Sequence, residues 1–246
     1  MSSPNCNRST LLSLTSVILL AFSSATSAQT GLGNGISAPG SPHNFIDNIG
    51  HAELPPFGGW NYSEELCRVC HVPHDHDRAT RYGDSGLLWN HAVSSATYTM
   101  YSSATLDGAS ASQPTGYSKM CLGCHDGTVA IDTFDKYAGG TVFMDDYNLN
   151  FIVPGASFAG DLTSTHPISI VYDESLDPNL HAKTDPIGGS GTIADVLEGG
   201  TVLQCSTCHD VHDQPGESIP GTALLRVPQT VFHGQPSGLC LTCHIK

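Results

Sequence analysis

The sequence predicts a mostly irregular fold, coil with short helices and a few short strands, in one or two domains. Gly (26) and Pro (15) together make up about a sixth of the 246 residues, and only 13% of the residues are charged. This composition excludes a coiled coil and disfavours a large regular barrel or a doubly wound sheet. The unusual counts are those of Cys (9) and His (13), so the chemistry of the chain is best sought in these two residue types.

Residues 1–28 have the pattern of a secretory signal peptide, which is removed from the mature chain. Arg8 precedes an apolar stretch at 11–22, and small residues then lead to an Ala-x-Ala-like cleavage site at Ala28. The apolar stretch is too short to span a bilayer comfortably, so an uncleaved anchor is the weaker alternative. We therefore expect an exported protein without a transmembrane segment in its mature part. Its expected location is extracellular or the cell surface, with the periplasm as the alternative.

The elements that follow are predicted from local sequence. Residues 29–60 form an extended N-terminal segment, since they begin with a run rich in Gly, Ser and Pro. The residues SEEL at 63–66 can cap a short helix, and TIADVLEG at 192–199 predicts a short helix ended by glycine. Residues 141–151 and 168–172 are candidates for short strands, and most of the remainder is turn and loop.

One motif, present four times, accounts for every cysteine after Cys6. Two cysteines three positions apart are followed directly by a histidine in CRVCH at 67–71 (motif I), CLGCH at 121–125 (motif II), CSTCH at 205–209 (motif III) and CLTCH at 240–244 (motif IV). This pattern is typical of c-type haem attachment. The two cysteines stand about one helical turn apart, so that both sulfurs reach the vinyl groups at one haem edge. The histidine then serves as the proximal iron ligand.

A disulfide framework or a zinc ribbon also uses paired cysteines, but neither explains a histidine after every second one. The sequence therefore predicts four covalently attached haem c groups. Because regular structure is sparse, the haems must supply the buried core, as in a multihaem cytochrome c, and we expect the haem-free chain not to fold. The attachment residues are Cys67, Cys70, Cys121, Cys124, Cys205, Cys208, Cys240 and Cys243, and the proximal ligands are His71, His125, His209 and His244.

The two halves of the chain repeat one pattern. Each contains CxxCHxxH, then a Leu-Leu marker at 87–88 or 224–225, then S-x-x-C-L-x-C-H. Duplication of a two-haem unit explains this pattern, and chance similarity around the motifs is the alternative. We therefore expect a tetrahaem domain at 61–246, with two dihaem units at about 61–135 and 195–246 joined by residues 136–194.

The second axial ligand of each iron should be a histidine, because nine histidines lie outside the motifs and methionines are few. Two imidazoles per iron give low-spin haems of low potential. His74 and His212 are candidates because each follows a proximal histidine by three positions, and His166 is one because it stands before Pro167. The fourth is open between His43 and His91. Surface or propionate-contacting positions are expected for His51, His76, His181 and His233.

Several of these segments resemble a known group, the doubled-CxxCH cytochromes. They are CRVCHVPH at 67–74, LLWNH at 87–91, MCLGCHDGT at 120–128, THP at 165–167, CSTCHDVH at 205–212 and CLTCHIK at 240–246. From about residue 40 to 246 the chain is most similar to the filament-forming outer-surface tetrahaem cytochromes (nanowire cytochromes) of metal-reducing bacteria. The resemblance implies a homopolymer in which one distal histidine comes from the neighbouring subunit, and that role falls on His43. His51 could fill the same role, and His91 offers an alternative within the chain.

The leading functional prediction is electron conduction from haem to haem in an extracellular filament, with outer-membrane or periplasmic redox partners. The alternative is a monomeric periplasmic electron shuttle. A multihaem reductase is the weaker prediction, because catalysis needs an iron with an open coordination site and all four motifs end in His. We therefore expect an electron-transfer protein and not an enzyme. The net charge of −14 excludes a nucleic-acid partner, which requires a basic surface.

Overall fold

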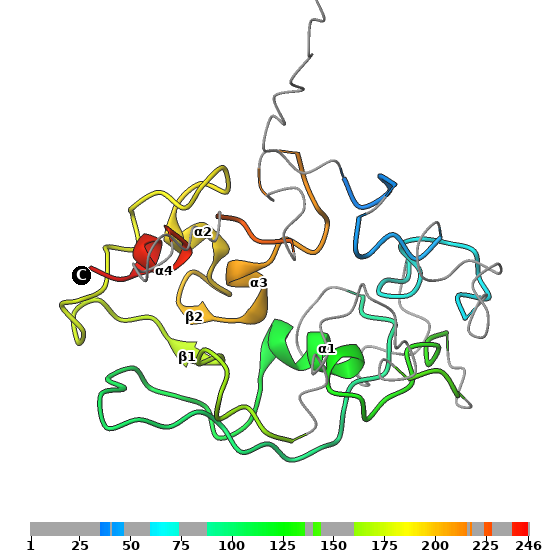
Figure 1. Ribbon diagram of the computed structural model, residues 1–246, viewed down its shortest axis with the longest axis horizontal. Helices are drawn as coiled ribbons and strands as arrows, with labels where there is room; N and C mark the ends of the chain where they lie inside the picture. Colours follow the sequence, from blue (N-terminus) through cyan, green and yellow to red (C-terminus); the bar gives the residue numbers. More distant parts are fainter. Residues whose placement is uncertain are drawn as a thin grey trace, which may run out of the picture. The chain divides into compact units, whose positions relative to one another are not determined.

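Three of the four motifs lie on short helices in the computed structural model (Figure 1). Helix α1 (Gly116–His125) carries motif II, α3 (Cys205–Cys208) carries the cysteines of motif III, and α4 (Gly238–Cys243) carries those of motif IV. The structure describes residues 35–39, 41–46, 60–73, 88–135, 140–143, 160–215, 217, 224–227 and 238–245. The chain divides into two units, 1–30 and 31–246. The predicted signal peptide lies outside the described residues.

Motif I lies on a turn, and the short helix that residues 63–66 were expected to cap, and that would carry this motif, is not formed. The Ser63 hydroxyl does accept a hydrogen bond from the Glu65 backbone N–H (3.2 Å), as a helix cap would. Glu64, however, has a φ of +53°. This left-handed conformation is incompatible with a helix, so the chain turns before Cys67. The backbone N–H of His71 then donates to the Cys67 carbonyl at 2.8 Å, which closes one turn around the motif.

Helix α2 (Ile193–Val196) confirms the short helix expected within 192–199. The Thr192 hydroxyl and backbone N–H both donate to the Asp195 carboxylate, at 2.7 and 2.8 Å. The helix has ended before Gly199, whose φ of +59° suits a residue without a side chain.

The strand expected at 168–172 is confirmed in its centre, where β1 (Ile170–Val171) pairs antiparallel with β2 (Val202–Leu203). Two other expectations fail in the described residues. Residues 141–143 are not in a strand, and the rest of 144–151 lies outside the description. Residues 35–39 and 41–46 form turns instead of an extended segment, since the Asn44 side chain donates to the carbonyls of Ser37 (3.0 Å) and Ala38 (3.2 Å) and holds the chain folded back.

The buried apolar side chains form three small clusters. The largest contains Ile170, Tyr172, Ile187, Ile193, Val196, Leu197 and Leu203, with Cys243 packed against it. The segment expected to be a linker therefore contributes residues between 170 and 193 to the core of the second half. A second cluster, Trp60, Val69, Ile131 and Phe134, packs against Cys70 and Cys124. A third contains Tyr98, Leu122 and Leu162. Motif cysteines thus border two of the three clusters.

The repeat predicted from the sequence is present in the backbone. In the first half, the N–H of Val72 donates to the Leu88 carbonyl (3.0 Å), and the N–H of Asn90 donates to the Cys70 carbonyl (2.8 Å). Single bridges join His71 to Trp89 and, in the second half, His209 to Leu225.

In the second half, the equivalent backbone bonds are donated by the N–H of Asp210 to the Leu224 carbonyl (2.8 Å) and by the N–H of Arg226 to the Cys208 carbonyl (2.9 Å). Leu88 and Leu224 also share a rare left-handed backbone, with φ of +50° and +58°. The Leu-Leu marker therefore has one structural role in both halves. The backbone around the marker is hydrogen-bonded to residues on both sides of the proximal histidine, and these bonds fix the direction of the chain there.

The two halves contact one another through their motifs, since α1 packs against α3 (Figure 1). In the described ranges, no helix is long and apolar enough to cross a membrane.

Candidate haem-binding site

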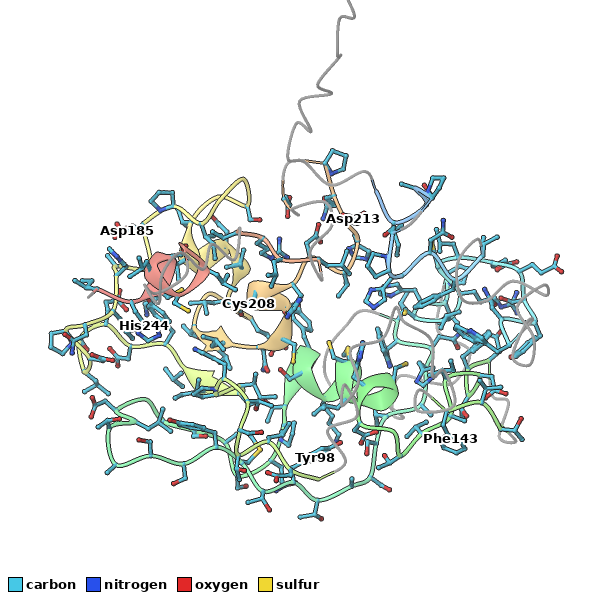
Figure 2. The ribbon with its side chains drawn as sticks, in the orientation of Figure 1. Tyr98, Phe143, Asp185, Cys208, Asp213 and His244 are labelled. Atoms are coloured by element: carbon cyan, nitrogen blue, oxygen red, sulfur yellow. The ribbon has the colours of Figure 1, made fainter. Side chains whose placement is uncertain are left out.

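All eight motif cysteines are free thiols, so the disulfide framework considered from the sequence is not formed. The contacts among these cysteines join motif I to motif II, motif II to motif III and motif III to motif IV. Cys70 of motif I and Cys124 of motif II border the same apolar cluster. The thiols of Cys121 and Cys205 are hydrogen-bonded to each other, which links motif II to motif III. Cys208, labelled in Figure 2, interacts electrostatically with Cys240 of motif IV.

Burial raises the pKa of these thiols. It raises the pKa of Cys124 to about 12 and those of Cys208 and Cys243 to about 11. Cys205 is the exception, because the hydrogen bond from Cys121 lowers its pKa to about 7. The thiols with a raised pKa are therefore neutral at physiological pH, whereas Cys67 and Cys240 are exposed.

Three of the four proximal histidines are paired with another histidine at nearly one spacing. The ring centroids are 6.3 Å apart for His71 and His212, 6.2 Å for His125 and His43, and 6.3 Å for His244 and His166. Two imidazoles bound to one metal, with a metal–nitrogen bond of about 2.0 Å each, have centroids about 6 Å apart. The residues present thus fit a bis-histidine haem iron at motifs I, II and IV. His244 lies just after α4 (Figure 2).

His43 and His166, two of the distal candidates, each have one ring nitrogen in contact with a backbone carbonyl oxygen. His43 Nδ1 contacts the Val211 carbonyl at 3.3 Å, and His166 Nδ1 contacts the Pro167 carbonyl at 3.0 Å. A carbonyl oxygen only accepts, so Nδ1 carries the proton in each ring and Nε2 has the lone pair that a metal needs. Burial lowers the pKa of His43, and the nearby His209 and His212 lower it further.

The pKa of His125 is lowered as well, to about 4, first by burial and then by the proximity of His43 and His209. Neutral imidazole is the form that binds metal. The His43–His125 pair lies within one chain, whereas the resemblance to filament cytochromes implies that His43 serves a neighbouring subunit.

His91, the runner-up for the fourth distal ligand, is placed differently. It is fully buried, with Nδ1 2.7 Å from the Ala92 carbonyl and Nε2 3.1 Å from the Ile131 carbonyl. Nε2 is also 3.5 Å from Cys124 Sγ. Both ring nitrogens face backbone oxygens, so His91 ties residues 92 and 131 together beside motif II. His43, by contrast, has its ring beside that of a proximal histidine, His125.

The remaining histidines divide into two groups. His181 is partly exposed and contacts the Asp185 carboxylate at 3.1 Å, which agrees with the surface position expected for it. His51, His74, His76 and His233 lie outside the described residues. The placement of His74 is therefore a prediction from sequence, while His212 is placed against motif I of the other repeat.

Two buried carboxylates beside the proximal histidines were not anticipated. Asp126 follows His125 and is 0% exposed, and Asp210 follows His209 and is 2% exposed. The sequence signal was an Asp directly after the His in motifs II and III, where motifs I and IV have Val72 and Ile245. Tyr98 donates its hydroxyl to Asp126, an interaction that sequence spacing does not reveal.

Across the described ranges, no three His, Cys, Asp or Glu side chains converge as they would to hold a metal ion by themselves. Neither a comparison with models of known protein families nor a search of curated proteins found a match to this chain.

Proposed function

We propose that this chain is a tetrahaem c-type cytochrome that transfers electrons, with one haem bound covalently at each motif. The observation that carries the proposal is the set of three imidazole pairs at 6.2 to 6.3 Å, each of which joins the histidine of a motif to a histidine outside the motifs. When bound, such haems exchange single electrons between neighbouring irons without a substrate pocket.

The chain's own residues supply the axial positions. His212 serves the motif I haem, His43 the motif II haem and His166 the motif IV haem. The repeat assigns His74 to the motif III haem, because His212 and His74 hold equivalent positions and His212 reaches across to the other repeat. With two imidazoles at each iron, no iron is left open for a substrate, which supports electron transfer over reductase chemistry.

One observation bears on the choice between a filament and a discrete carrier. Haem iron has two axial positions, and His43 lies beside His125 of its own chain. A ligand from a neighbouring subunit would have to displace it. This placement favours an exported carrier that holds its own ligands, in the periplasm or outside the cell. The filament implied by the resemblance requires the 35–46 segment to exchange between copies.

The proposal is tested on exported, haem-matured protein. Pyridine haemochrome analysis and intact mass should give four covalent haems, and electron paramagnetic resonance should show low-spin ferric iron only. His43→Ala should convert one haem in four to a high-spin form that binds CO when reduced. His181→Ala is the matched control, because the His181 side chain contacts the half-exposed Asp185 and the substitution leaves its backbone bonds in place, so the spectrum should be unchanged.

Fewer than four haems, or an unchanged spin state in His43→Ala, would refute the assignment. Electron microscopy and light scattering on the same preparation separate the two carriers. Monomers support the discrete form, and thin unbranched filaments with His43 on a neighbour's haem support the polymer.

A further inference from the structure

The residue that follows the proximal histidine divides the four motifs into two classes. Motifs II and III have Asp126 and Asp210, which are 0% and 2% exposed, whereas motifs I and IV have the apolar Val72 and Ile245. The thiol contacts place motifs II and III between motifs I and IV. A buried carboxylate therefore accompanies each of the two inner motifs.

The Asp126 carboxylate is held entirely by neutral donors among the residues that the structure describes. Tyr98 donates its hydroxyl to Oδ2, and the Thr128 backbone N–H donates to Oδ1 at 2.8 Å. The Thr128 hydroxyl donates to the same carboxylate, at 2.9 Å from Oδ1 and 2.8 Å from Oδ2. These donors keep Asp126 an acceptor, and hence an anion, but none cancels its charge. That charge acts on Cys124 and His125, the two residues that anchor the motif II haem.

Asp210 occupies the equivalent position but has a counter-charge. Arg226 Nη2 lies 3.9 Å from Asp210 Oδ1, and the guanidinium is only 12% exposed. Backbone N–H groups of His212 (3.3 Å) and Gln214 (2.6 Å) complete its contacts. The same guanidinium also binds the more exposed Glu217 at 2.8 Å. The two inner motifs thus differ in that a buried cation lies near Asp210, whereas Asp126 is held by neutral donors in the described residues.

We propose that Asp126 makes the motif II haem the site of lowest reduction potential among the four. Ferric haem takes up one electron to become ferrous haem, with no bond made or broken and no proton moved. The oxidised form carries one more positive charge, and an uncompensated anion in a low-dielectric site stabilises it. Arg226 offsets part of this effect at motif III, and motifs I and IV lack a carboxylate at this position. The inference rests on the proposed tetrahaem function.

The test is a spectroelectrochemical titration of the holoprotein and its variants. Asp126→Asn keeps the size of the side chain and one acceptor oxygen but removes the charge, so one of the four midpoint potentials should shift upward. Asp210→Asn is the matched control at the equivalent position and should give a smaller shift. In a His43→Ala background, Asp126→Asn should shift the high-spin haem, which assigns the effect to motif II.

Tyr98→Phe separates charge from packing. It removes one donor from a carboxylate that stays ionised, so the same potential should move downward. Equal upward shifts in Asp126→Asn and Tyr98→Phe would mean that disturbed packing sets the potential, and would overturn the proposal. An unshifted potential in Asp126→Asn, or a larger shift in Asp210→Asn, would overturn it as well.

The haem count distinguishes this failure from failure of the proposed function. A wild-type chain that carries fewer than four haems refutes the tetrahaem assignment, whereas four haems with no shift in Asp126→Asn refute only the role of Asp126.

Discussion

Arg226 offers the sharpest test of how the second repeat is stabilised. Its guanidinium donates to the Ser206 carbonyl (3.1 Å), the Ser190 hydroxyl (3.0 Å) and Glu217 (2.8 Å), and lies 3.9 Å from the buried Asp210. Arg226→Met keeps the apolar stem and removes the charge. Breaking a buried ion pair from one side costs about 3–5 kcal/mol. Because Asp210 retains its backbone donors, we expect a loss at or somewhat below the lower limit of this range, about 2–3 kcal/mol.

The assay is urea unfolding of the holoprotein, followed by loss of the low-spin haem spectrum. Glu65→Gln is the control at the surface, since Glu65 is 60% exposed and its partner Arg68 is 44% exposed. Surface pairs of this kind contribute about 1 kcal/mol or less. Adding Asp210→Asn to Arg226→Met should recover part of the loss, because the uncompensated charge is then gone. A change below about 0.5 kcal/mol in Arg226→Met would refute the reasoning, since that is within the range of an ordinary surface substitution.

Three further predictions concern packing, pH and haem. Gly123→Ala should lower the urea midpoint despite the better helix propensity of alanine, because an added Cβ would lie 2.5 Å from the Ala92 carbonyl oxygen; a raised midpoint would contradict this contact. Burial, followed by the bond to Asp126, raises the pKa of Tyr98 to about 12. The unfolded chain loses this proton first, so about 2 kcal/mol of stability should be lost between pH 10 and pH 12, and Tyr98→Phe should flatten that part of the stability profile. Chain produced without haem attachment should show no cooperative thermal transition by calorimetry, and a sharp transition would show that the polypeptide folds alone.

The motifs and the repeat were predictable because they depend on local spacing. A CxxCH run fixes which atoms reach one haem edge wherever the run lies, and the backbone bonding around Leu88 and Leu224 repeats because the sequence there repeats. The left-handed backbone at these leucines was not predictable, since leucine ordinarily avoids it. Nor were the different surroundings of His43 and His91, whose rings contact the carbonyls of Val211 and Ile131 from distant parts of the chain.

The turn before motif I is a second feature that local sequence did not predict. Ser63 provides the capping hydroxyl that predicted a helix, yet Glu64 takes a positive φ and the chain turns instead. Tyr62 explains part of this outcome, because its hydroxyl donates to the Phe134 carbonyl at 3.0 Å and its ring stacks on Phe134. A contact between residues that are distant in sequence thus overrides a local preference, and no window around 63–66 contains that information.

The pairing of His212 with His71 gives the duplication a consequence that the sequence repeat alone does not carry. A unit that kept both ligands of each haem to itself would be complete when separated from its copy. In the proposed assignment, the motif I haem would take its distal ligand from the other repeat, so the first half alone would lack a full ligand set. The Cys121–Cys205 contact and the packing of α1 on α3 join the same two halves. In the proposed assignment, a haem attached covalently to one repeat is also ligated by the other repeat and so links the two. Loss of His212 should therefore weaken the contact between the halves and change the spin state of one haem.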